Sequence, residues 1–139
     1  MDFDFSDDQA QLRDAVRKWV DKSYGFDDRR HCVAEGGFSQ ASYQALAELG
    51  LTGLWVQEAY GGMGMGPVDA MVAMEELGRG LLLEPLAHAW IASAVLQGFA
   101  PEPLRQAWLP RIASGDALVV LAHQERGARG GRVCAWPDK

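Results

Sequence analysis

A run of glycines between positions 61 and 66, Gly-Gly-Met-Gly-Met-Gly, has the residue types of a loop that cradles phosphate. A dinucleotide-binding loop needs the pattern G-x-G-x-x-G between a strand and a helix. Gly62 and Gly64 supply the first pair, but Pro67 stands at the third position, and the next register meets an aspartate. No Gly-Lys-Ser/Thr follows, which excludes a P-loop. We interpret the segment as a tight connection in which several residues adopt positive φ.

Titratable side chains suggest no complete active site. His31, His88 and His123 lie far apart, and none has a second ligand at helical spacing, so the pattern predicts no metal site. Glu75 and Glu76 are neighbours, and neighbours on a helix point in different directions, so they cannot act as an acid/base couple. We expect Glu75 on the apolar side of its helix, paired with an arginine, and Glu76 in solvent. No Ser-His-Asp or Cys-His arrangement is indicated.

The composition is that of one soluble globular domain. The chain has 139 residues, of which 48% are hydrophobic and 23% charged, so a sizeable core is expected. Its net charge of -6 argues against nucleic acid as partner, although arginines make positions 126–132 locally basic. No segment has the length of a membrane span, and Met1–Asp4 is too acidic for a signal peptide. We expect a cytoplasmic protein in which Cys32 and Cys134 are free thiols.

Hydrophobic spacing predicts five or six helices. In chain order the predicted segments run from Ser6 to about Ser23–Gly25, over Asp27–Glu35, from Ser39 to Gly50, from Pro67 through Leu77, from Pro85 through Leu96, and over Leu104–Ile112 with Gly115 as the stop. Local signals support these bounds. Ser6 and Gln9 have the spacing of a capping box, and prolines suit a first helical turn. Pro110 should bend the last helix or end it early.

Two segments do not follow helical spacing. Leu51–Val56 is a short apolar run that is either extended or a turn. Asp116–His123 predicts a buried strand, but no other segment predicts a partner for it. Because a lone buried strand leaves its backbone groups unpaired, its sheet belongs to a part that this chain lacks or to another chain. From Gly127 onward the sequence is rich in Gly and Arg and loses periodicity.

Several segments, taken in order, resemble the acyl-CoA dehydrogenase family. The run LAELGLTGLWVQEAYGGMGMG (46–66) is similar to a family motif that ends in Glu-x-Tyr-Gly-Gly-x-Gly. The opening MDFDFSDDQAQLRDAVRKWV resembles the family's first helix, and MEELGRG (74–80) resembles the helix after the motif. WLPRIASGDALVVLAHQERGAR (108–129) resembles the lead-in to a middle β domain. The resemblance covers residues 1–129.

The resemblance implies an all-α, up-and-down-like helical domain over residues 1–115. One β-strand would end it and begin the flavin-binding middle β domain at 116–129, with an irregular tail at 130–139. The family's members are FAD enzymes that desaturate acyl-CoA thioesters: a glutamate takes the α proton and the flavin takes the β hydride. That glutamate lies in a final helical bundle, so no catalytic residue is assigned here. The pattern is nearest to small-subunit-like members acting on dicarboxylyl- or steroid-type CoA thioesters.

The resemblance also implies where the flavin would be contacted. The family's flavin-binding strand ends in Thr/Ser-Glu-Pro-Gly, and the matching residues here are Gln124, Glu125, Arg126 and Gly127. Gln124 replaces the hydroxyl residue but can still donate a hydrogen bond, and Arg126 replaces the proline. The predicted cofactor-binding residues are therefore His123, Gln124, Glu125 and Gly127.

Two functional hypotheses remain. The chain is an amino-terminal fragment of an FAD-dependent acyl-CoA dehydrogenase, inactive alone, or it is a non-catalytic helical module that docks on a complete homologue. In the first case acyl-CoA binds only when the missing domains are present. Without those domains, Leu81, Leu82, Leu83, Leu86 and Leu118–Leu121 should be left facing water. We therefore expect self-association or binding to a homologous subunit.

Overall fold

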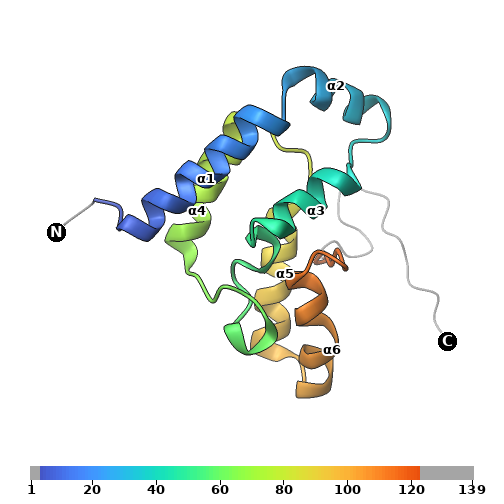
Figure 1. Ribbon diagram of the computed structural model, residues 1–139. Coiled ribbons are helices and arrows are strands. Elements are labelled where there is room, and N and C mark those ends of the chain that lie inside the picture. Colours follow the sequence, from blue (N-terminus) through green and yellow to red (C-terminus); the bar gives the residue numbers. More distant parts are fainter. Residues whose placement is uncertain (1–3, 123–139) are drawn as a thin grey trace, which may run out of the picture.

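The computed structural model describes residues 4–122, and this part of the chain is all-α, as predicted (Figure 1). It contains no strand between residues 4 and 122. Its elements are α1 (Asp7–Ser23), α2 (Phe26–Ala34), α3 (Gln40–Glu48), the 3-10 turns η1 (Leu51–Gly53) and η2 (Glu58–Tyr60), α4 (Pro67–Arg79), α5 (Leu86–Phe99) and α6 (Glu102–Ala113).

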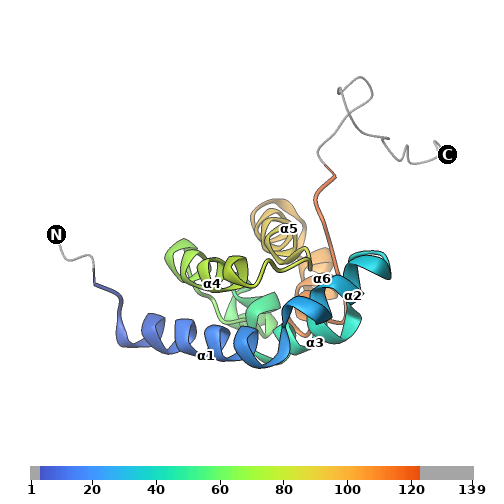
Figure 2. The same ribbon diagram turned by 90° about the horizontal axis from the view of Figure 1, so that it is seen from above.

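The helices form two layers around a central turn. Helix α1 pairs with α4, while α5 packs on α6 and both contact η1. Figure 2 shows α4 and α5 in one layer and α1, α2 and α3 in the other. Among the described helices, none has both the length and the apolar character needed to cross a membrane.

The predicted starts of α1, α3 and α4 are confirmed, while α2, α5 and α6 begin one or two residues away from the predicted positions. At α1 the Ser6 hydroxyl accepts from the Gln9 backbone N–H at 3.2 Å, and the Gln9 side chain accepts from the Ser6 N–H at 3.1 Å. This capping box satisfies donors that the first turn leaves without partners. Pro67 is the first residue of α4, and Pro85 directly precedes α5.

Pro110 was predicted to bend α6 or to end it early, and it does not end the helix. The helix continues to Ala113, and the Ser114 N–H donates to the Pro110 carbonyl at 3.0 Å. Leu109 and Ile112, on either side of the proline, are fully buried. Their packing holds the last turn together although the proline removes one backbone donor.

The buried strand predicted at Asp116–His123 was also wrong over the residues that are described. Positions 116–122 are neither helix nor strand, and Leu118, Val120 and Leu121 are 41–53% exposed. A strand needs a second strand to pair its backbone groups, and none exists within residues 4–122.

The core gathers side chains from most elements around η1. Leu51, Thr52 and Leu54 are completely buried at its centre, and Leu77 of α4 belongs to the same hydrophobic cluster as Leu51 and Leu54. Leu86 is 1% exposed and belongs to this core, so the expectation that it faces water was wrong. It lies on the inner face of α5, where burial of a leucine contributes roughly 2 kcal/mol.

The glycine loop is a tight connection, as interpreted from the sequence. Gly61 and Gly64 have φ of 82° and 63°, which is the left-handed region. Gly62 has another reason to be glycine, because a Cβ there would lie 2.1 Å from the Val56 carbonyl oxygen. The loop therefore folds directly onto the backbone that follows η1.

We predict that Gly62→Ala destabilises the protein by about 2–3 kcal/mol, because a methyl group would overlap rigid backbone. Gly98→Ala is the matched control, since nothing lies within 4 Å of its Cβ position in α5. That change should stabilise by about 0.5–1 kcal/mol through helix propensity. Urea unfolding followed by circular dichroism measures both, and equal stabilities for the two variants would contradict this packing.

Candidate functional site

The chain leaves α6 along a path fixed by two hydrogen bonds. The Thr52 hydroxyl in η1 donates to the Ala113 carbonyl at 2.8 Å. The Ala117 N–H then donates to the Arg111 carbonyl at 2.9 Å. These bonds tie the end of α6 to the centre of the domain. They fix the path of the chain from the end of α6 as far as Ala117.

Gly115 makes the turn between these two anchors. Its φ is 77°, and a Cβ would lie 2.6 Å from the Cβ of Ala47, so the turn packs closely on α3. Val119 then packs against the second core cluster, around Leu109. The side chains of Leu118 and Val120, on either side of Val119, are exposed. The exit segment thus presents one apolar edge to the domain and one to water.

The predicted flavin contacts His123, Gln124, Glu125 and Gly127 lie outside the described residues. Their assignment stays a prediction. The described part ends at Ala122, one residue before them.

The motif that carries the family resemblance is built into the scaffold. The Met63 N–H donates to the Gly53 carbonyl at 3.0 Å, and the Met65 N–H donates to the Leu54 carbonyl at 2.8 Å. These two backbone amides of the motif therefore donate to carbonyls at the centre of the domain. The motif is a structural support, and its glycines do not form a phosphate cradle.

The hydroxyl of Tyr60, in the same motif, lies 3.0 and 3.1 Å from the two carboxylate oxygens of Glu102 at the start of α6. Burial raises the pKa of Tyr60, and its contact with the Glu102 carboxylate acts in the same direction. This contact joins the motif to the helix that leads into the exit segment.

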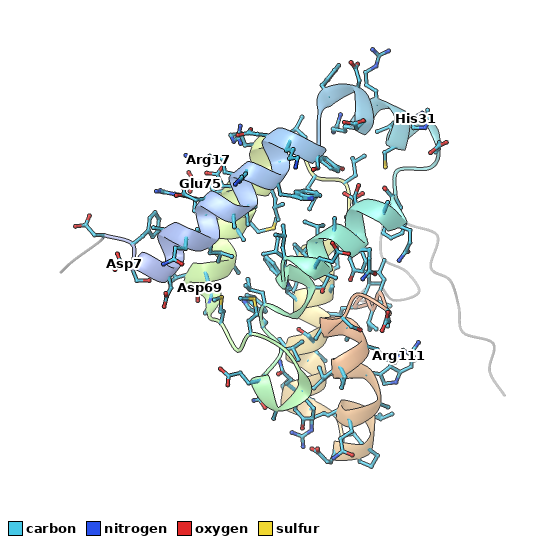
Figure 3. All side chains as sticks on the ribbon, viewed as in Figure 1. Asp7, Arg17, His31, Asp69, Glu75 and Arg111 are labelled. Atoms are coloured by element: carbon cyan, nitrogen blue, oxygen red, sulfur yellow. The ribbon has the colours of Figure 1, made fainter. Side chains whose placement is uncertain are left out.

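Glu76, and not Glu75, is the buried carboxylate of α4. Glu76 is 2% exposed, whereas Glu75 faces water. Arg17 of α1 donates to both carboxylate oxygens of Glu76, and Arg79 donates a further bond at 3.1 Å. Arg79 also pairs with Asp21 at 2.7 Å. The expectation that Glu75 pairs with an arginine and that Glu76 is solvated was wrong. Helix α1 packs on the side of α4 that carries Glu76. Arg17 and Glu75 are labelled in Figure 3 to locate these two helices.

These contacts keep Glu76 ionised. The hydrogen bond from Arg17 lowers the pKa of its carboxyl, against the effect of burial, and Arg79 adds to the lowering. A general base works best with a pKa near the operating pH, so Glu76 is unsuited to proton transfer. It clamps α1 to α4.

Glu84 is a second buried carboxylate, which the sequence analysis missed. It is 4% exposed, and it accepts from the Tyr24 hydroxyl at 2.9 Å and from the Ser39 N–H at 3.2 Å. Burial raises the pKa of Tyr24 to about 12, so the phenol stays protonated. Through its two carboxylate oxygens, Glu84 joins the ends of α1 and α3 to the α4–α5 connection. A signal was present in the sequence, because Glu84 interrupts the apolar run at 81–86.

The described residues thus define a class: an all-α domain with a glycine-locked loop, buried structural carboxylates and no assembled set of catalytic groups. Residues 6–116 match the family model "Acyl-CoA dehydrogenase, N-terminal domain". The chain belongs to the acyl-CoA dehydrogenase family and corresponds to its N-terminal domain.

Individual relatives agree with this assignment. The chain is 30% identical to a probable acyl-CoA dehydrogenase of Bacillus subtilis, over 85% of this chain and 32% of the relative. A structure of the ChsE4-ChsE5 complex of Mycobacterium tuberculosis matches 92% of the chain and 33% of its own chain, with a TM-score of 0.74 and 22% identity. A glutaryl-CoA dehydrogenase of Mycobacterium smegmatis with FADH2 matches 82% of the chain and 30% of its own, with a TM-score of 0.65 and 21% identity. The chain spans about a third of the length of the relatives it matches.

We predict that Glu76→Gln lowers the free energy of unfolding by about 1–3 kcal/mol near pH 7, because it weakens three hydrogen bonds to arginine. The folded-state pKa of Glu76 is lowered. The contribution of the ionised Glu76 carboxylate to the free energy of unfolding is therefore fully present above the unfolded-state pKa of about 4.3. It is lost as the pH falls through the lower folded-state pKa.

The difference between wild type and Glu76→Gln should thus shrink as the pH falls below about 4. Urea midpoints at a series of pH values measure it. Glu75→Gln is the control on the neighbouring exposed position and should change stability by less than about 0.5 kcal/mol. An equal loss of stability in the two variants at neutral pH would contradict the conclusion that Glu76 holds α1 and α4 together.

Proposed function

We propose that this chain supplies the amino-terminal helical domain of an FAD-dependent acyl-CoA dehydrogenase and is inactive by itself. The observation that carries the proposal is the family match over residues 6–116, together with a length of about a third of the relatives. The helical domain extends to residue 115, the middle β domain begins at 116–129, and 130–139 is a tail outside both.

The role of this domain is to position and support. The bonds from Thr52 and Ala117 direct the chain toward His123–Gly127, where FAD would be contacted. Bound FAD accepts the hydride removed from the acyl-CoA thioester. The two buried carboxylates, Glu76 and Glu84, are both engaged in hydrogen bonds within the domain. Neither of them is free to remove the α proton, and the family resemblance assigns that role to a glutamate in a final helical bundle.

A second candidate function is a non-catalytic module that docks on a homologous subunit. It is favoured by the number of large apolar side chains that are exposed on α4 and α5, such as Met71 at 55% and Ile91 at 42%. The ChsE4-ChsE5 relative is a complex of two named components. A cytoplasmic location suits either function and agrees with the free thiol of Cys32, which is buried.

We predict no dehydrogenase activity for the isolated chain, because proton and hydride removal both need groups within hydrogen-bond reach of the substrate. The purified protein would be mixed with FAD, a panel of acyl-CoA thioesters and an artificial electron acceptor. A complete acyl-CoA dehydrogenase serves as the positive control. Turnover above the protein-free blank would overturn the proposal of an inactive fragment.

We also predict that the isolated chain binds FAD weakly or not at all. At most one edge, from Leu121 to Gly127, would contact the ring, whereas cofactor sites enclose most of their ligand. Titration of FAD fluorescence with the protein measures this. Near-stoichiometric flavin that stays with the protein through gel filtration would show that the chain holds a complete site.

A further inference from the structure

The segment 25–37, which contains α2, is fixed to the domain by the residues that flank it. Before the segment, the Tyr24 hydroxyl donates to the Glu84 carboxylate at 2.9 Å. After it, the Ser39 N–H donates to the other oxygen of the same carboxylate at 3.2 Å. Tyr24 and Glu84 are both buried, so one carboxylate holds both ends of the segment in place. These bonds do not involve the residues between the two ends.

Helix α2 itself is weakly attached to the domain. Among the helices of residues 4–122, it alone has no extended packing against another helix or 3-10 turn, and Figure 1 shows it beyond the ends of α1 and α3. Cys32 is its only buried residue, whereas Phe26 and Val33 are 67% and 51% exposed. Regions with few buried apolar contacts open at a lower free energy than the core does.

One hydrogen bond connects α2 to the body of the domain. The Arg29 Nε donates to the Leu81 carbonyl, which follows the end of α4, at 3.0 Å. In the described part of the chain, the other hydrogen bonds of residues 25–37 stay within the segment. Breaking the bond between Arg29 and Leu81 therefore frees the segment without disturbing any other hydrogen bond of the domain.

Empty space lies on two sides of α2. A cavity of about 400 Å³ lies between it and the start of α3, where Cys32 faces Ser39 and Ser42. A second cavity, of about 280 Å³, lies toward the ends of α1 and α4, and Phe26 and Arg29 line it. Side chains that border a void lose attractive contacts on that side. Movement of α2 consequently breaks little packing in either direction.

Glycines stand at both ends of the helix. Gly25 precedes α2, and its N–H donates to the Asp28 carboxylate at 3.2 Å, so this cap can move together with the helix. Gly36 and Gly37 follow α2 with φ of 112° and 82°, and nothing lies within 4 Å of the Cβ position of either. Glycine accepts a wide range of backbone angles, and a few residues at the ends of an element suffice to absorb a hinge motion.

We propose that residues 25–37 form a hinged strap, which moves away from the domain about its glycines while the other helices stay folded. The open form admits solutes to the cavity next to α3 and to the Cys32 thiol. This inference goes beyond the proposed function and does not depend on the reaction of the complete protein.

Cys32 reports the opening, because the closed strap protects its thiol. The residue is 8% exposed. Burial raises the pKa of the thiol, and the carboxylates of Glu84 and Glu35 act in the same direction. Alkylating reagents attack the thiolate, so the buried, protonated sulfur of the closed form reacts slowly.

Labelling of Cys32 with iodoacetamide in the full chain, in a Cys134→Ser background that leaves one thiol, measures the open fraction. Mass spectrometry follows the labelling at a series of urea concentrations below the unfolding transition. Reagent is kept in the range where the rate is proportional to its concentration, so that the rate reports the open population. Opening of the strap exposes little surface, and the rate should be nearly independent of urea. A rate that rises in parallel with the unfolded population would overturn the proposal.

Three substitutions in this background separate the strap from the whole fold. Arg29→Ala removes the bond to Leu81 and should speed labelling by about three- to tenfold. Arg30→Ala, the matched control, removes the same charge from the exposed neighbouring position and should change the rate by about twofold at most. Ile112→Val shortens a fully buried side chain of α6 and should raise the unfolded population by about two- to tenfold, with no change in labelling.

The last variant identifies the route by which Cys32 is reached. If only global unfolding exposed the thiol, Ile112→Val would speed labelling by the same factor as it raises the unfolded population. That result, or equal labelling rates for Arg29→Ala and Arg30→Ala, would overturn the strap. Turnover by the isolated chain, which would overturn the proposed function, is a separate measurement.

Discussion

The structure depends on burying a short turn, η1, at the centre of the domain without leaving its backbone unpaired. Leu51, Thr52 and Gly53 are all buried, although they belong to no long helix or sheet that would satisfy their polar groups. The Trp90 indole donates to the Leu51 carbonyl at 2.6 Å, and the glycine loop supplies further donors to Gly53 and Leu54. One requirement thus fixes α5, α6 and the glycine loop, which is that the polar backbone and side-chain groups of η1 have hydrogen-bond partners.

This constraint explains why the residues of the family motif serve the structure of the described domain. Its glycines are needed where the loop returns to the turn, most clearly at Gly62 against Val56. The buried carboxylates join elements at the edges of the domain, where Glu76 joins α1 to α4 and Glu84 joins the ends of α1 and α3 to the α4–α5 connection. The described residues form a support around η1 and fix the path of the chain out of α6 as far as Ala117.

The sequence predicted what depends on local contacts. The capping box at Ser6 and the number of helices, five or six, follow from short-range spacing, and both are confirmed within residues 4–122. Predictions that needed knowledge of neighbouring elements failed. The partner of Glu76 is on a helix 59 positions away, and periodicity along α4 alone does not reveal where α1 packs. Asp116–Ala122 has the composition of a strand, but a strand forms only when another is present to pair with it. The candidate flavin contacts were reached through family resemblance alone.

Native-state hydrogen exchange is the most direct test of the claim that the motif is a structural support and not a ligand site. Amides of residues 51–65 would be followed with and without FAD and an acyl-CoA thioester. The account predicts that the Leu54, Met63 and Met65 amides exchange only through global unfolding, at the same free energy as the core of α5, and that the ligands leave their protection unchanged. Exchange of the loop through local opening, or protection that increases when ligand is added, would contradict it.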